Sequence, residues 1–178
     1  MRLSELYKKE IIPRLKEKFG YTNDMDIPRL SKVSLNVGVG RFSKDKNYIE
    51  GVIKDLTVIT GQKPMIAKAR KSISAFKVRE GDSVGIAVTL RGEKMYDFVD
   101  KLVNVTLPRV RDFRGISPKK LDNKGNITIG FKDQTAFPEI RLENVEKTHG
   151  LEVSIETTAQ NKEQGQELLS LLGFPFSK

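Results

Sequence analysis

Two short segments of this chain alternate apolar residues with small or polar ones, and this alternation is the feature that most constrains the fold. Val and Leu occupy every second position of residues 33–39, and residues 84–91 repeat the pattern with Val, Ile and Leu. Successive side chains of a strand point to opposite sides of a sheet, so each segment predicts a strand with one buried side. Such strands are typical of an antiparallel sheet that is covered on one face only.

Four segments place apolar residues at the spacing of a helix face. They are residues 3–19, 46–60, 93–107 and 162–172. Pro13 falls inside the first and predicts either a kink or a later start, because proline lacks the N–H of a helical turn. Asp45 is placed to cap the second helix, and Asn161 with Gln164 resembles a capping box at the start of the last.

The order of these elements indicates the fold class. Further strands are predicted at residues 65–67, 127–131 and 151–157. Helices and strands therefore mix without the strict alternation of a parallel doubly wound sheet. We expect a single α+β domain over residues 1–178, in which helices pack on one face of an antiparallel sheet and the other face is open.

The chain is strongly basic, and the charge is uneven along it. It has 32 Lys and Arg against 23 Asp and Glu, a formal net charge of +9. Residues 1–131 carry 27 basic and 15 acidic side chains, whereas residues 132–178 carry 5 and 8. An excess of positive charge favours polyanionic partners such as nucleic acid. The N-terminus lacks a signal-peptide pattern and no apolar run is long enough to cross a bilayer, so we expect a cytoplasmic protein without a membrane partner.

Residue usage argues against catalysis. The absence of cysteine excludes disulfides, thiolate metal sites and a cysteine nucleophile, and a single histidine, His149, excludes a multi-histidine metal centre. His149 lies in a polar turn without a recognisable nucleophile motif, and we expect it to be exposed there. Carboxylates are scattered rather than gathered as a two-metal site requires. We therefore expect no catalytic residue, no metal and no cofactor.

Two alternative functions stay open at this level. Gly38 and Gly40 leave a strand and precede a helix, as in a dinucleotide-binding fingerprint, but Ser43 stands where the third glycine belongs. These glycines either permit a tight turn or a bulge, or serve a nucleotide-dependent enzyme. The other alternative is a generic basic protein that binds DNA or an anionic membrane surface through charge alone.

A basic segment gives the stronger signal. Between Lys63 and Arg79 the chain has six basic side chains and no acidic one, with Ser72, Ser74 and Phe76 interleaved among them. Lys and Arg neutralise phosphates, hydroxyls add hydrogen bonds, and an aromatic ring can stack on a base. The segment favours nucleic-acid contact over the alternative, a solvated loop that tucks Ile73 and Phe76 into the core.

A second basic cluster consists of Arg109, Arg111 and Arg114, in a loop that also contains Asp112. Arginine suits the forked geometry of a phosphate. Pairing between Asp112 and one of these arginines, which would hold the loop together, explains the cluster equally well.

The polar side of the predicted sheet adds a third element. By alternation Asn36, Thr89 and Arg91 point away from the core, and their neighbours on that side are small. A flat face of this kind lets an RNA backbone come close while amide, hydroxyl and guanidinium groups bind it. On the last strand Glu152 and Glu156 point outward and would repel phosphate. We therefore expect RNA on the first half of the sheet.

Six strings of residues carry a resemblance to a known family. They are LNVGVG (35–40), GQKPMIAKARKSISAFKVREG (61–81), VTLRGEKMYDF (88–98), LPRVRDFRG (107–115), FPEI (137–140) and GFPF (173–176). In order and spacing they resemble the family of bacterial large-subunit ribosomal protein five, which binds 5S ribosomal RNA in the central protuberance. The resemblance covers nearly the whole chain and implies a structural constituent of the large ribosomal subunit in the cytoplasm.

The resemblance also implies partners for particular residues. The 5S rRNA contact would be made by Asn36, Gln62, Lys63, Thr89 and Arg91. Contact with the tRNA in the peptidyl site would be made by Arg70, Lys71, Ser72, Ser74, Phe76, Lys77 and Arg79. An intersubunit bridge to protein thirteen of the small-subunit head would involve loops of the second half, including Arg109, Arg111 and Arg114 and parts of residues 133–150. Further implied partners are 23S rRNA and other proteins of the central protuberance.

Overall fold

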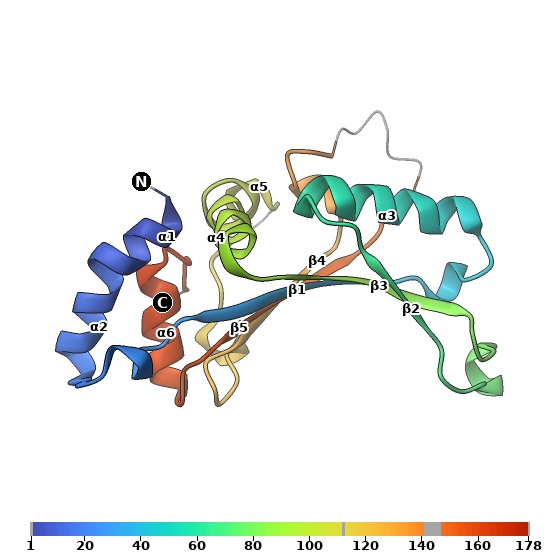
Figure 1. The fold of residues 1–178 in the computed structure, drawn as a ribbon. Helices are drawn as coiled ribbons and strands as arrows, with labels where there is room; N and C mark the ends of the chain where they lie inside the picture. The colour runs from blue at the N-terminus through green and yellow to red at the C-terminus, as the bar shows by residue number, and fades with distance from the viewer. Residues whose placement is uncertain (1, 112, 141–146, 178) are drawn as a thin grey trace. The chain divides into compact units, whose positions relative to one another are not determined.

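A five-stranded sheet is the central element of the structure, a computed structural model that describes residues 2–111, 113–140 and 147–177. Its strand order is β2-β3-β1-β5-β4 (Figure 1). The strands are β1 (Leu30–Gly38), β2 (Met65–Lys68), β3 (Ser83–Leu90), β4 (Ile127–Phe131) and β5 (Leu151–Thr157).

Neighbouring strands run antiparallel, as predicted. β2 pairs antiparallel with β3. The main-chain N–H of Val39, just after β1, donates to the carbonyl of Val84 near the start of β3, at 3.0 Å. The N–H of Thr158, just after β5, donates to the carbonyl of Arg29, just before β1, at 2.9 Å. The end of one strand therefore meets the beginning of its neighbour.

The chain forms two compact units. The first comprises Met1–Val33, Leu90–Ile129 and Ser154–Lys178, and the second comprises Ser34–Thr89 and Gly130–Val153. The first unit contains helices α1 (Leu3–Leu6), α2 (Ile12–Phe19), α4 (Gly92–Lys101), α5 (Leu107–Arg109) and α6 (Lys162–Leu171). The second contains α3 (Lys46–Thr60).

Proline shapes two helical segments of the first unit in the same way. A π-helical turn, Tyr7–Ile11, joins α1 to α2, and another, Leu102–Thr106, joins α4 to α5. Pro13 and Pro108 follow these turns within the first two residues of α2 and α5. The proline ring clashes with the carbonyl four residues earlier, and a wider π turn provides the room. The first helical segment therefore starts at Leu3, and the π turn precedes Pro13.

The predicted capping box before α6 is wrong in its detail. The side chain of Asn161 makes no capping hydrogen bond. Instead the Oε1 of Gln164 accepts from the main-chain N–H of Gln160 at 3.1 Å. A glutamine side chain one turn into the helix reaches either of two neighbouring N–H groups, and sequence spacing alone does not decide between them.

In the second unit, α3 covers one side of the strands and leaves the other side open (Figure 1). The Oδ1 of Asp45 accepts from the N–H of Tyr48 at 3.1 Å, so the predicted cap is confirmed. Gly61 ends the helix in the left-handed conformation. The buried residues of α3 are Ile49, Val52, Leu56, Ile59 and Thr60. Burial of this apolar face holds the helix against the sheet, so the predicted α+β class with one covered face is confirmed.

Candidate nucleic-acid interface

The uncovered side of β1 and β3, here called the open sheet face, is small and polar. Asn36 and Thr89 are exposed on it, whereas Leu35 and Val37 are fully buried on the other side of β1. A side chain added at Gly85 would lie 3.6 Å from the Oδ1 of Asn36. The amide of Asn36 therefore lies over a glycine, and no bulky side chain at that position separates it from the main chain.

The turn after α3 brings Gln62 to the end of β3. Gly61 adopts φ 64°, and the N–H of Gln62 donates to the hydroxyl of Thr60 at 3.3 Å. The Nε2 of Gln62 then donates to the carbonyl of Thr89 at 3.3 Å. Two predicted site residues that are distant in sequence are thus brought together, and Lys63 is exposed beside them in the chain.

Arg91 directly follows β3 and precedes α4. Its main chain is extended, with φ −139° and ψ 163°, and its side chain is exposed. This backbone continues the alternation of β3, in which Thr89 is exposed and Leu90 is fully buried. The predicted outward orientation of Arg91 is therefore confirmed.

The connection between β2 and β3, residues 69–82, is an ordered hairpin extension and is called the basic loop below. Ile73 and Val78 exchange main-chain hydrogen bonds of 2.9 and 3.2 Å. Between them Ser74–Phe76 form a short 3-10 turn, which ends at Lys77 with φ 53°. The left-handed conformation is uncommon for a residue with a side chain, so the loop tip has a specific and mildly strained geometry.

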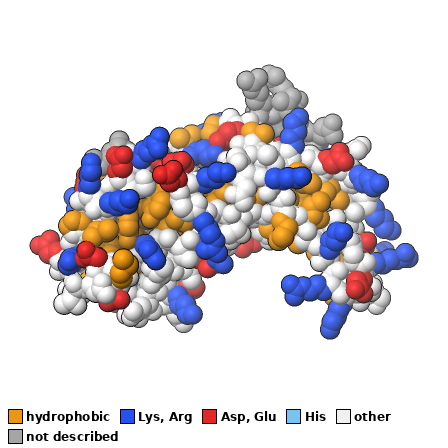
Figure 2. Space-filling model, in the orientation of Figure 1, with side chains coloured by type: hydrophobic (Ala, Val, Ile, Leu, Met, Phe, Trp, Pro, Cys, Tyr) orange, Lys and Arg blue, Asp and Glu red, His pale blue; other side chains and the backbone are white. Residues whose placement is uncertain are grey.

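The basic loop presents its side chains to solvent. Its predicted contact residues are all exposed: Arg70, Lys71, Ser72, Ser74, Phe76, Lys77 and Arg79. Phe76 is 75% exposed and Ile73 is 48% exposed, so the alternative that Phe76 is tucked into the core is wrong. Figure 2 shows Lys and Arg side chains gathered over this loop, which Figure 1 draws in green.

One acidic side chain of the loop, that of Asp82, is hydrogen-bonded within the loop. The Oδ2 of Asp82 accepts from the main-chain N–H of Arg79 at 2.9 Å. A carboxylate engaged with its own backbone competes less with an incoming phosphate. The positive potential of the neighbouring side chains is therefore left for a partner.

The second basic cluster lies in the first unit. Arg109, Arg111 and Arg114 are all exposed, and Asp112 is outside the described residues, so the two interpretations of this loop stay open. The chain directly after the cluster is anchored: the N–H of Ile116 donates to the carbonyl of Pro175 at 2.7 Å. Residues of the C-terminal GFPF string thus fix one end of the arginine loop.

The glycine-containing turn before α3 has a structural role. Gly40–Phe42 form a short 3-10 turn, and the ring of Phe42 packs against that of Tyr48 with centroids 4.6 Å apart. A side chain at Gly40 would meet only the carbonyl of Val84, at 3.9 Å. The turn therefore closes through ring packing onto the start of α3, which favours the tight-turn interpretation over a dinucleotide site.

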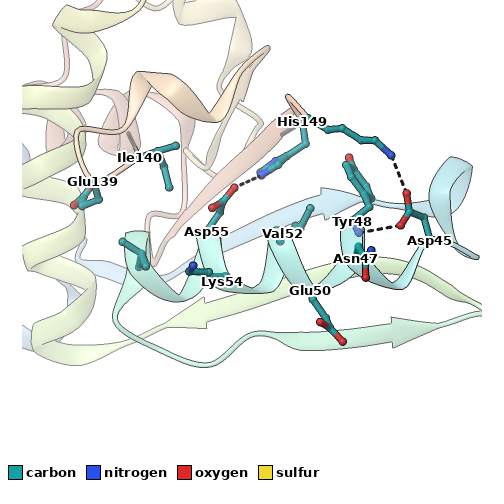
Figure 3. A pocket seen from close by; sticks show the side chains of 13 residues that line it. Asp45, Asn47, Tyr48, Glu50, Val52, Lys54, Asp55, Glu139, Ile140 and His149 are labelled. Carbon is teal, nitrogen blue, oxygen red and sulfur yellow. Dashed lines mark hydrogen bonds and ion pairs between the residues drawn. The ribbon is translucent and has the colours of Figure 1, made fainter. Parts of the chain in front are cut away.

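His149 is buried, so the prediction of an exposed turn histidine is wrong. It is only 5% exposed, and its Nε2 lies 3.3 Å from the Oδ2 of Asp55 on α3 (Figure 3). Its main-chain N–H donates to the Oε1 of Gln134 at 2.8 Å. Polar flanking residues concealed this burial, because both partners lie far away in the sequence.

His149 lines a hollow of about 520 Å³ beside α3, called the α3 pocket. Asp45 and Lys147 also line it, and the Nζ of Lys147 lies 2.8 Å from the Oδ2 of Asp45 (Figure 3). The hydrogen bond from Lys147, and then that from the N–H of Tyr48, lower the pKa of Asp45. Four of the side chains that line the pocket therefore pair within the fold, Asp45 with Lys147 and Asp55 with His149.

Neither a metal centre nor a membrane span is found in the described parts of the chain. No group of three or more His, Asp or Glu side chains there is arranged to hold a metal ion. No helix there is both long and apolar enough to cross a membrane.

Comparison with known proteins identifies the family. Residues 23–79 match the sequence model described as Ribosomal protein L5, and residues 83–176 match the model of the C-terminus of the same ribosomal family. The chain belongs to the ribosomal protein L5 family. These two matches include the open sheet face, residues 69–79 of the basic loop and the arginine cluster.

Relatives within the L5 family are similar over nearly their full length. The chain is 55% identical over 172 residues to large ribosomal subunit protein uL5 of Desulfatibacillum aliphaticivorans, covering 97% of this chain and 96% of that one. It is 51% identical over 175 residues to the uL5 of Syntrophomonas wolfei, with 98% of each chain covered. It is 52% identical over 176 residues to that of Halothermothrix orenii, with 99% and 98% covered.

Membership of the L5 family settles the class of function. The chain is an RNA-binding structural protein of the large ribosomal subunit and acts in translation. It is not an enzyme, so the alternative of a nucleotide-dependent enzyme is discarded.

Proposed function

We propose that this L5 family member binds 5S rRNA through the open sheet face and the turn that follows α3. The observation that carries the proposal is the pairing of Gln62 with the carbonyl of Thr89 at 3.3 Å beside exposed polar side chains. This contact fixes the turn against the strand, so the groups that would face RNA are ordered before RNA arrives. The ligands would be Asn36, Gln62, Lys63, Thr89 and Arg91.

Two kinds of interaction would contribute to 5S rRNA binding, one to affinity and one to selectivity. Lys63 and Arg91 are exposed cations that would neutralise phosphates, and this contribution to affinity falls as salt rises. Asn36 and Gln62 would read the edges of unstacked bases in an RNA loop, and that contribution depends on the sequence and shape of the RNA. Charge alone would supply affinity without this selectivity.

The other surfaces would contact other partners. We assign the basic loop to the tRNA in the peptidyl site, because its cations, hydroxyls and Phe76 are all exposed. We assign Arg109, Arg111 and Arg114, with a surface of the second half of the chain, to an intersubunit bridge with protein thirteen of the small-subunit head. 23S rRNA and other proteins of the central protuberance complete the set of partners.

A salt series tests the 5S assignment. Binding to labelled 5S rRNA is compared with binding to a non-cognate structured RNA of equal length as the salt concentration rises. We expect 5S rRNA to bind about a hundredfold more tightly, or about 2.7 kcal/mol, with the difference persisting at high salt. Equal affinities for the two RNAs that fall together as salt rises would indicate a generic basic protein and would reject the proposal.

Single variants then test the choice of face. Arg91→Ala and Gln62→Ala should each weaken 5S binding, by about twofold to tenfold for a lost hydrogen bond. Thr128→Ala on β4 is the control, because Thr128 is an exposed polar residue whose hydroxyl lies 3.1 Å from Ser154 rather than beside Gln62. An unchanged affinity in Arg91→Ala would show that the wrong face has been chosen.

A further inference from the structure

A hollow of about 670 Å³ opens beside the basic loop and is called the loop pocket. It is lined by Lys44, Ser72, Ser74, Lys77, Val78, Arg79 and Glu80. All but one of these residues belong to the basic loop. Lys44 comes from the segment between the 3-10 turn at Gly40–Phe42 and α3, so the pocket joins two segments that are distant in sequence.

The lining has the chemistry of an anion site. It combines three cationic side chains with two hydroxyls, and its single carboxylate belongs to Glu80. Within residues 2–111, 113–140 and 147–177, no carboxylate forms a salt bridge with Lys44, Lys77 or Arg79. Cations without a partner raise the local positive potential, and Arg and Lys with nearby hydroxyls are the groups that bind phosphate oxygens.

Main-chain hydrogen bonds fix the loop and one of the two hydroxyls. The N–H of Glu80 donates to the Oγ of Ser72 at 2.9 Å, and a hydroxyl that accepts this bond still has a hydrogen to donate. The hydrogen bonds between Ile73 and Val78 close the loop, and Lys77 is fixed in the left-handed conformation. Ordering the ligands in advance reduces the entropy lost on binding.

We propose that the loop pocket binds one phosphate group of an RNA backbone and that Lys44 is one of its ligands. The proposal deepens the assignment of the basic loop to tRNA and rests on it. A base is the weaker candidate for this pocket, since Val78 is its one apolar lining residue and Phe76 is not part of the lining. The phosphate enters the loop pocket, and Phe76 stays available for stacking outside it.

The direct test is an NMR titration of the full, ¹⁵N-labelled chain with uridine 3′-monophosphate, with uridine as the probe that lacks phosphate. We expect saturable shifts of the Ser72, Ser74 and Glu80 amides with the nucleotide only. Equal shifts with uridine would mean that the loop recognises the nucleoside and would overturn the proposal. An absence of saturable shifts with either probe would also overturn it.

Charge variants test the lining itself. Lys44→Gln should weaken nucleotide binding by up to about fivefold, the upper end of an exposed charge interaction. Lys46→Gln is the matched control, since Lys46 is also exposed and lies two residues away but does not line the pocket. Glu80→Gln should strengthen binding by a similar factor, because it removes the one carboxylate. Equal effects of Lys44→Gln and Lys46→Gln would mean that general electrostatic attraction explains the binding, and would overturn the proposed phosphate site.

Measuring 5S rRNA and tRNA binding with the same variants separates this proposal from the proposed function. We expect Lys44→Gln to leave 5S affinity within twofold of the unmodified chain and to weaken tRNA retention on ribosomes. If the titration succeeds and tRNA retention is unchanged, the loop pocket binds phosphate but the tRNA assignment fails. If tRNA retention falls when the basic loop is mutated but the titration fails, the assignment stands and the pocket does not.

Discussion

The α3 pocket and the loop pocket lie in the same unit and are both lined by charged side chains, but their charges are arranged differently. In the α3 pocket Lys147 lies 2.8 Å from Asp45, and His149 lies 3.3 Å from Asp55. In the loop pocket the cations are exposed and form no salt bridge with a carboxylate of the described residues. The first arrangement satisfies charge within the fold, whereas the second leaves it for another molecule.

The difference teaches which charged residues to assign to stability and which to binding. A buried or half-buried charge needs a partner, because its desolvation is costly. Like charges that gather on a surface repel one another, which costs some stability and is useful only when a polyanion neutralises them. Disrupting the α3 pocket should therefore change folding, and disrupting the loop pocket should change binding.

The largest expected effect is on folding, from Gln134→Ala, because Gln134 bonds to the main chain of two residues that line the α3 pocket. Gln134 is buried, and its amide donates to the carbonyl of Lys147 and accepts from the N–H of His149. Alanine leaves both main-chain groups without this partner, so the free energy of unfolding should fall by about 2–4 kcal/mol. Urea denaturation measures the change.

Gln160→Ala is the control for this experiment, because Gln160 is an exposed glutamine. The free energy of unfolding of this surface variant should stay within about 0.5 kcal/mol of that of the unmodified chain. Equal losses in the two variants would contradict the view that the α3 pocket is held by its internal hydrogen bonds.

The next effect is on binding, from the double variant Lys71→Ala, Lys77→Asn in the basic loop. Asparagine tolerates the left-handed conformation that Lys77 adopts, so the change removes charge without adding backbone strain. Retention of peptidyl-site tRNA should weaken, with the slope of log affinity against log salt reduced by about 0.7–0.9 for each phosphate that is no longer neutralised. The free energy of unfolding should change by less than about 0.5 kcal/mol.

The same double variant should bind 5S rRNA as the unmodified chain does. Filter binding at several salt concentrations provides that measurement. Loss of 5S binding in this variant would mean that the surfaces assigned to 5S rRNA and to tRNA have been exchanged.

Local periodicity predicts which side chains of the candidate interface are exposed, because the pattern itself is local. Alternation along residues 33–39 and 84–91 is enough to place Asn36, Thr89 and Arg91 on the outer side of the strands. The charge run between Lys63 and Arg79 predicts an exposed loop for the same reason. These predictions need only the period of a strand and the cost of burying charge.

Long-range contacts account for what sequence analysis misses. Polar neighbours suggest that His149 is exposed, but it is buried against Asp55 and Gln134, which are separated from it along the chain. Lys44 is far from the basic loop in sequence, and only the folded chain brings it to the same hollow as Ser72. Which main-chain N–H donates to the side chain of Gln164 likewise depends on local geometry that sequence spacing does not determine.

The smallest expected effect is a pH dependence, which tests whether the Asp45–Lys147 pair of the α3 pocket stabilises the fold. Hydrogen bonds from Lys147 and from the N–H of Tyr48 lower the pKa of Asp45, so its carboxylate is favoured in the folded state. This contribution is fully present above the unfolded pKa of about 3.9 and is lost as the pH falls through the lower folded pKa. Asp45→Asn keeps a good helix cap and removes only the charge. The variant should therefore be less stable than the unmodified chain at pH 6, with the difference shrinking towards pH 3.

Asp97→Asn on α4 is the control, because it removes the same charge from another exposed site. A difference between the Asp45 variant and the unmodified chain that persists unchanged at pH 3 would show that the ion pair is not what Asp45 contributes to stability.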